Sequence, residues 1–279
     1  MKTRIIIDST ANMKPELYDK VTVIPLTVHF KEEEYIDGVT ITNEEFYKKL
    51  VEADELPRTS QVTPDGFMKY FEEVKEAGDE AVVITVASKL SGTCQSAMIA
   101  AKEYDNIYVV DSGNVAVGSG IIAEYAIKLA EEGKSAKEIK EILDKEKENV
   151  YIIAMVDTLK YLKMGGRISG VVAFAGGLLN IKPIVSVYDG VIQMIAKARG
   201  AKQGNQTLIS EIEKMGQVDF SKPVRFGHSG LTDEGMQLFL ENSKDFWAEG
   251  KVDMQSVLMG SVIGTHAGPG IVAIAFFKK

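Results

Sequence analysis

The stretch EAVVITVASKLSGTCQSAMIAAKEY, residues 80–104, decides the fold class of this chain. It begins with an apolar run of strand length over residues 80–86, continues through a short polar turn, and ends in a helical pattern. Apolar runs also lead into polar turns in TRIIIDST (3–10) and IYVVDSG (107–113). Strands that alternate with helices in this way predict βαβ units and a parallel sheet.

The second half of the chain follows a different pattern. After YIIAMV (151–156), glycine pairs appear, and the apolar run PIVSVYDGVIQMI carries Asp189-Gly190, a dipeptide typical of a tight turn between antiparallel strands. We therefore predict an α/β protein of two domains. An N-terminal parallel-sheet domain spans residues 1–156, and a C-terminal domain with a mixed or antiparallel sheet flanked by helices spans residues 157–279.

Composition excludes several classes of function. The 279 residues carry a net charge of −8, and an acidic chain is a poor general binder of nucleic acid. Cys94 is the single cysteine, so the chain forms no internal disulfide and fits a reducing, cytoplasmic setting. No apolar run reaches the roughly 18 residues of a membrane span, so we expect no membrane insertion. We expect a monomer.

Polar and cationic segments recur at the expected loops. In parallel sheets, ligands bind beyond the carboxyl ends of the strands, where the polar turns described above lie. Further candidates are RTSQ (58–61), KLSGT (89–93), KMGGR (163–167), AKARG (196–200) and GTHAGPG (264–270). Together they offer hydroxyls, backbone N–H groups, a histidine and the arginines Arg167 and Arg199, which are the donors of a small anion pocket. They include no clear set of base, nucleophile and metal ligands, so we predict binding without catalytic or metal-binding residues.

The segment GTHAGPG raises the question of why a histidine stands among so many glycines. We predict that its glycines and proline form a tight turn that brings His266 to a ligand.

Two enzyme-like alternatives follow from the residue types. GSGIIA (118–123) matches the G-x-G-x-x-A fingerprint of dinucleotide binding, but Asp111-Ser112-Gly113-Asn114 separates it from the preceding strand, which argues against that function. A serine hydrolase that acts on a lipid-like ester through Ser91 and His266 remains the alternative to a binding protein, because a catalytic triad is recognised by geometry rather than by sequence order.

The motifs taken together resemble the DegV family of bacterial fatty-acid-binding proteins, over essentially the whole chain. The matching segments are DST (8–10), RTSQ (58–61), SKLSGT (88–93), DS (111–112), YLKMGGRIS (161–169), LLNIKPI (178–184), IAKAR (195–199) and IGTHAGPG (263–270). The resemblance implies one long-chain fatty acid, with its carboxylate between the domains and its acyl chain buried in the second. It also implies a separate kinase that phosphorylates the presented carboxylate for phospholipid synthesis, and no other cofactor.

The resemblance also assigns roles to individual residues. Thr59 and Ser91 would hydrogen-bond the carboxylate, with His266 beside them, and Ser60 and Gly92 would shape the pocket. Arg167 and Arg199 would lie at its mouth, where planar guanidinium groups suit an acyl phosphate or kinase docking. Lys89 departs from the small or polar residue usual in the family, and its role stays open. The apolar segment VVAFAGGLL (171–179) is a candidate lining of the acyl tunnel.

Overall fold

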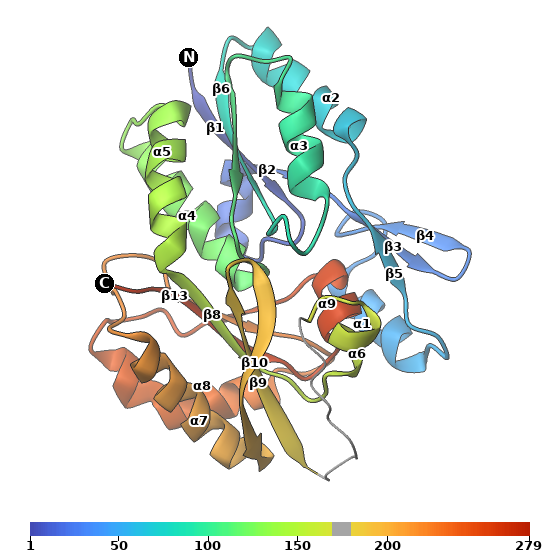
Figure 1. The fold of residues 1–279 in the computed structure, drawn as a ribbon, viewed down its shortest axis with the longest axis vertical. Helices are drawn as coiled ribbons and strands as arrows, with labels where there is room; N and C mark the ends of the chain where they lie inside the picture. Colours follow the sequence, from blue (N-terminus) through green and yellow to red (C-terminus); the bar gives the residue numbers. More distant parts are fainter. Residues whose placement is uncertain (169–179) are drawn as a thin grey trace.

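The parallel sheet predicted from the apolar runs is present. The computed structural model describes residues 1–168 and 180–279 (Figure 1). Its first sheet has the order β2-β1-β6-β7, and every pair in it is parallel. The strands are β2 (Val21–Ile24), β1 (Thr3–Asp8), β6 (Glu80–Thr85) and β7 (Ile107–Asp111). The continuous apolar runs arise because helices cover both faces of this sheet.

Two pairs of helices cover the first sheet. Residues of α2 (Pro64–Glu76) and α3 (Thr93–Ala101) share an apolar core with Ile6 and Val83, which face one side of the sheet. On the other side, α4 (Val117–Glu131) and α5 (Ala136–Glu146) pack with residues such as Ile7. At the start of helix α2, the Thr63 side chain accepts from Gly66 N–H, and Pro64 lies in the first turn.

The second sheet is mixed, as predicted. Its order is β10-β9-β8-β13-β11-β12, and its pairs are antiparallel except for β11 with β12. The strands are β8 (Val150–Met155), β9 (Ile181–Tyr188), β10 (Val191–Arg199), β11 (Arg225–His228), β12 (Ser256–Leu258) and β13 (Val272–Phe277). Asp189-Gly190 forms the predicted turn of the β9–β10 hairpin. Helices α7 (Gly200–Met215) and α8 (Glu234–Ala248) cover one face.

The two sheets share apolar packing. Strand β8, which we had placed at the end of the first domain, hydrogen-bonds to β9 and β13 and so belongs to the second sheet. One continuous core also joins Ile5 and Val82 of the parallel sheet to Ile152 and Phe277 of the mixed sheet. The division into domains at residues 156 and 157 stays a prediction.

A third, smaller unit lies beside the parallel sheet. It is an antiparallel sheet of β4 (Glu33–Ile36), β3 (Thr27–Phe30) and β5 (Arg58–Ser60). We had expected the RTSQ segment to be a loop, but residues 58–60 form β5, because they pair with β3. Helix α1 (Asn43–Glu52) follows β4 and begins with a capping box at Thr42.

Our prediction of a turn around His266 needs correction. His266 lies in the last turn of a short helix, α9 (Ser261–Ala267), which packs between α1 and α6 (Lys160–Met164). The glycines permit this packing. A Cβ on Gly264 would lie 2.5 Å from Phe46 Cε1, and one on Gly268 would lie 2.3 Å from the Tyr161 ring. Gly268, with φ +78°, then ends the helix.

We predict that Gly264→Ala destabilises the protein. The added methyl group would overlap the buried rings of Phe46 and Tyr47, and overpacking of this kind costs about 1–3 kcal/mol. Gly235→Ala in α8 is the matched control, since a Cβ there meets Val272 at an ordinary 3.4 Å. Urea unfolding of the two variants measures the difference, and equal stability of both would contradict the packing described for α9.

Candidate functional site

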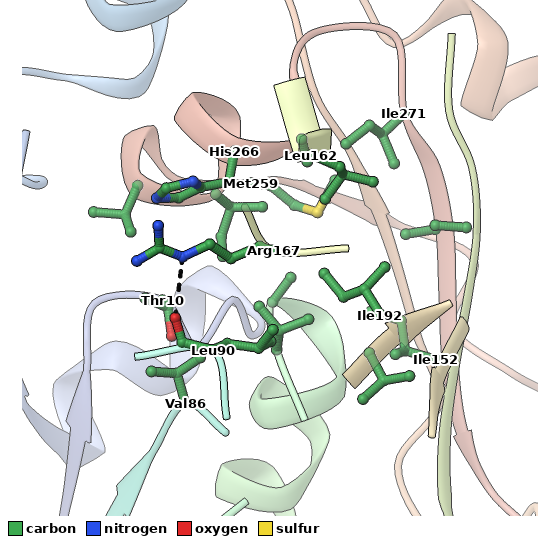
Figure 2. Close-up of a pocket in the computed structure, with 18 of the residues that line it drawn as sticks. Thr10, Val86, Leu90, Ile152, Leu162, Arg167, Ile192, Met259, His266 and Ile271 are labelled. Atoms are coloured by element: carbon green, nitrogen blue, oxygen red, sulfur yellow. Dashed lines mark hydrogen bonds between the residues drawn. The ribbon is translucent and has the colours of Figure 1, made fainter. Parts of the chain in front are cut away.

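A cavity lies where the two sheets and α9 meet. Its lining includes Thr10 after β1, Val86 after β6, Ile152 in β8 and Leu162 in α6, and the empty space between lining atoms, open mouth included, is about 860 Å³. Figure 2 shows His266 and Arg167 at one end and Ile152 and Ile192 at the other. The cavity therefore lies at the carboxyl ends of β1 and β6, where the polar turns had predicted a ligand.

Small residues on one face of the mixed sheet leave room for this cavity. On β13, Ala273 lines the cavity, while its neighbours Val272 and Ile274 point into the core beneath α7 and α8. On β8, Ala154 likewise lines the cavity. Because side chains alternate along a strand, this face can be small while the opposite face remains well packed.

The wall of the cavity is apolar except at one end. Aliphatic side chains and Met259 form most of the lining. The polar groups gather at the end that holds His266, and they are Thr10, Thr59, Ser91 and Arg167. Ser186 also borders the cavity, but its hydroxyl donates to Ile152 O at 2.7 Å and is thereby satisfied. An apolar tunnel with one polar end fits an amphipathic ligand with a single polar head.

Thr59 and His266 meet at the centre of the polar end. Thr59 Oγ1 lies 2.8 Å from His266 Nε2, and the direction of the bond depends on the tautomer of the ring. When Nε2 carries the proton, it donates to Thr59, and the Thr59 hydroxyl is then free to donate to a bound oxygen. His266 Nδ1 is buried, and no partner for it occurs within residues 1–168 and 180–279.

Arg167 supplies the positive charge at this end. Its Nε donates to Leu90 O at 3.2 Å and one Nη to Gly165 O at 2.6 Å, so two backbone carbonyls hold the guanidinium beside the His266 ring (Figure 2). Gly165 allows this arrangement, because a Cβ there would lie 2.4 Å from His266 Nδ1. A guanidinium has five N–H groups, and these two bonds to the described residues use two of them.

The charge state of His266 follows from its surroundings. Burial, followed by the positive charge of Arg167, lowers the pKa of His266 from 6.5 to about 4. The ring is therefore neutral at pH 7, and Arg167 is the cation that faces a ligand. A carboxylate bound here would favour the protonated ring and raise the pKa of His266.

The remaining predicted residues of the SKLSGT loop lie close by. Ser91 lines the cavity, and its Oγ lies 3.0 Å from Thr93 Oγ1. Gly92 precedes α3 and shapes the loop indirectly, since a Cβ on it would collide with the Gln61 side chain at 2.1 Å. The turn after β1 is fixed by the buried Asp8, which accepts from Thr10 Oγ1 and from Val86 N–H. The turn after β7 lines a neighbouring groove instead of the cavity.

Besides Gly92, two further predicted residues do not line the cavity. Ser60 follows Thr59 on β5 and so points to the other face, where its Oγ lies 2.8 Å from His29 Nε2. Arg199 ends β10 as an exposed residue and does not line the cavity. The segment 171–179, a candidate tunnel lining, lies outside the described residues. Sequence analysis missed the small wall residues Ala154 and Ala273. Alanine alternates with larger residues around Ala273, but β8 shows no such pattern around Ala154.

The geometry does not assemble the hydrolase that we kept as an alternative. Ser91 Oγ contacts Thr93, whereas the His266 ring contacts Thr59. A pKa near 4 also makes His266 a weak base at neutral pH. The glycines of GSGIIA lie inside α4, where a Cβ on Gly120 would fall 1.9 Å from Asn12 O, so close helix packing explains them.

Residues 1–168 and 180–279 contain no group of three or more His, Cys, Asp or Glu side chains placed to hold a metal ion. None of the helices described there is long and apolar enough to cross a membrane.

Comparison with known proteins identifies the family. Residues 2–279 match the family described as "Uncharacterised protein, DegV family", and the chain belongs to this family. A DegV domain-containing protein of Caldanaerobacter subterraneus is 34% identical over 285 residues, which cover 100% of this chain and 99% of that protein.

Solved structures of the family show the same fold. A fatty-acid-binding DegV family protein from Thermus thermophilus superposes with a TM-score of 0.86 at 28% identity, over 100% of both chains. A protein from Eubacterium ventriosum, described as binding stearic acid, superposes with a TM-score of 0.84 at 29% identity, over 100% of this chain and 99% of that one.

We predict a distinct pH dependence from His266. Between about pH 6.5 and about pH 4 the unfolded chain binds a proton that the folded, ligand-free protein excludes, so the free energy of unfolding falls as the pH falls through this window. His266→Gln lacks this contribution. Urea unfolding of both proteins from pH 4 to pH 7 gives the difference between their free energies of unfolding. Groups that titrate alike in the two proteins cancel in this difference. Parallel curves would show that the ring is not buried in its neutral form.

Proposed function

We propose that this protein binds one long-chain fatty acid, with its carboxylate at Arg167, Thr59, Ser91 and His266. The observation that carries the proposal is the single polar end of an otherwise apolar cavity. Burial of an acyl chain contributes about 0.8 kcal/mol per methylene, so the apolar wall supplies most of the affinity. The carboxylate loses its water on entry and needs charge-assisted hydrogen bonds, which Arg167 and the hydroxyls supply.

The relatives support the same ligand. The Thermus thermophilus and Eubacterium ventriosum proteins are described as binding fatty acids, and they share the fold over nearly their whole length. With the carboxylate beside His266, the acyl chain would extend toward Ile152 and Ile192.

We further propose that the protein presents the bound acid to a separate kinase, which forms an acyl phosphate for lipid metabolism. Two features support this role. The chain contains no Walker-type phosphate loop of its own. The polar end offers donors for a carboxylate. The His266 ring bonds to the Thr59 hydroxyl, whereas a serine hydrolase needs a contact between its histidine and its serine. We place this role in the cytoplasm and assign it to a monomer.

The two arginines provide a matched test of the binding site. Arg167→Ala should weaken fatty-acid binding about tenfold or more, because a hydrogen bond to a charged group contributes about 1.5–3 kcal/mol. Arg199→Ala, which removes the same side chain outside the cavity, should leave this affinity unchanged. Displacement of a fluorescent fatty acid measures both. A fatty alcohol of equal length should bind the wild type and Arg167→Ala alike.

The same variants test presentation to a kinase. With kinase and ATP added, Arg199→Ala should reduce acyl phosphate formation although the acid stays bound. Equal loss of fatty-acid affinity in the two variants would contradict the proposed position of the carboxylate, and undiminished turnover of Arg199→Ala would remove Arg199 from the docking surface.

A further inference from the structure

The apolar end of the cavity is built by residues from separate elements. Val115 follows β7, Ile152 comes from β8, and Val187 and Ile192 come from the two strands of the β9–β10 hairpin. A fatty acid whose carboxylate lies at Arg167 directs its methyl end toward these side chains. The acyl length that fits therefore depends on how firmly this end is closed.

The tip of the β9–β10 hairpin lies directly behind this end. Asp189 is two residues from Val187, and Gly190 is two residues from Ile192. Both tip residues have left-handed backbone angles, with φ +49° and +69°, as a two-residue hairpin turn requires. The turn connects the two strands directly, and Val187 pairs with Ile192, so a displacement of the tip would be passed to both wall residues.

The tip rests on the loop that follows β6. Lys89 Nζ lies 2.5 Å from Asp189 Oδ2, and a Cβ on Gly190 would contact Ala87 Cβ at 3.6 Å and Lys89 Cβ at 3.7 Å. This ion pair joins the hairpin of the mixed sheet to the loop that also carries Ser91. Lys89 had no role in the binding of the carboxylate.

A second groove lies on the outer side of the same wall. Lys89, Tyr151, Tyr188 and Asp189 line it, and Val187 borders both this groove and the cavity. The rings of Tyr151 and Tyr188 meet edge to face, with 6.5 Å between their centroids, so the groove offers apolar surface just outside the wall. Acyl carbons that passed the wall would meet these rings instead of open water.

We propose that the Lys89–Asp189 ion pair holds the hairpin tip over the methyl end of the cavity and so limits the length of the acyl chain. This inference rests on the proposed fatty-acid function. The pair is exposed, with 49% of the Lys89 side chain and 90% of the Asp189 side chain accessible, so it contributes little to global stability. Its effect is local, because it fastens the hairpin tip to the loop of residues 88–90. Reversing the charge of one partner turns this attraction into repulsion.

Lys89→Glu tests the proposal by placing two carboxylates in contact at the tip. Affinities are measured for saturated fatty acids from C12 to C22 by displacement of a fluorescent fatty acid. In the wild type, affinity should stop rising beyond the length that fills the cavity. In Lys89→Glu it should go on rising for two or more further carbons, by up to about fourfold for each methylene that reaches the tyrosine rings.

Two further variants make the result specific. Lys20→Glu introduces the same change of charge at a pair of equal length, Lys20 Nζ to Glu131 Oε1 at 2.5 Å, whose residues do not line the cavity, and it should keep the wild-type profile. Asp189→Asn removes the ion pair without adding repulsion and retains a residue that tolerates a positive φ, so it should shift the profile in the same direction as Lys89→Glu.

The outcomes separate this inference from the proposed function. A length profile of Lys89→Glu that equals those of the wild type and Lys20→Glu would overturn the role of the ion pair while leaving fatty-acid binding intact. An equal shift in Lys20→Glu would also overturn it, since net charge would then be the cause. A wild type that binds no fatty acid of any length would overturn both.

Discussion

The hydrogen bond between Thr59 and His266 joins two segments that are 207 residues apart in the chain. Strand β5 of the small sheet carries Thr59, and helix α9 carries His266 just before the final strand of the mixed sheet. The rest of the site is arranged around this contact. Gly165 permits the approach of α6 to the ring, and Arg167, two residues later, places its guanidinium beside it. A polar end built from β5, α9 and the loops that follow β1, β6 and α6 thus closes an apolar cavity.

The cavity itself is a compromise between stability and binding. A face lined by Ala154 and Ala273 leaves apolar space that larger side chains would fill, and unfilled space in a core costs stability. Under the proposed function, an acyl chain in this space would restore the missing contacts, and its binding would then be thermodynamically linked to folding. Burial has two opposing effects at His266. It would strengthen hydrogen bonds to a bound carboxylate, but it disfavours a charged ring in the ligand-free protein.

Much of the fold could be predicted because local sequence and tertiary structure agree. The apolar runs that became β1, β6 and β7 are buried on both faces, and Asp189-Gly190 marks its hairpin without ambiguity. Helix α9 could not be predicted in this way. Gly264 and Gly268 resemble turn residues in sequence, but they are required by rings of α1 and α6, which are remote in the chain.

The site residues also divide into those that local sequence predicts and those that depend on tertiary structure. Thr59, Ser91, Arg167 and His266 could be singled out from polar motifs, and they line the cavity. The Ser60 side chain points away from the face that carries Thr59, because residues 58–60 form a strand that pairs with β3. No local sequence pattern revealed this pairing. The apolar wall was also beyond local patterns, since it depends on which face of β8 and β13 meets the parallel sheet.

The central claim is that the cavity holds a single fatty acid, and native mass spectrometry of the purified protein tests it most directly. The account predicts a one-to-one adduct whose mass, after denaturing extraction, is that of a long-chain fatty acid. The ligand-free protein should take up one equivalent from an added mixture of fatty acids. A clean mass of the bare chain, with no uptake from that mixture, would contradict the account.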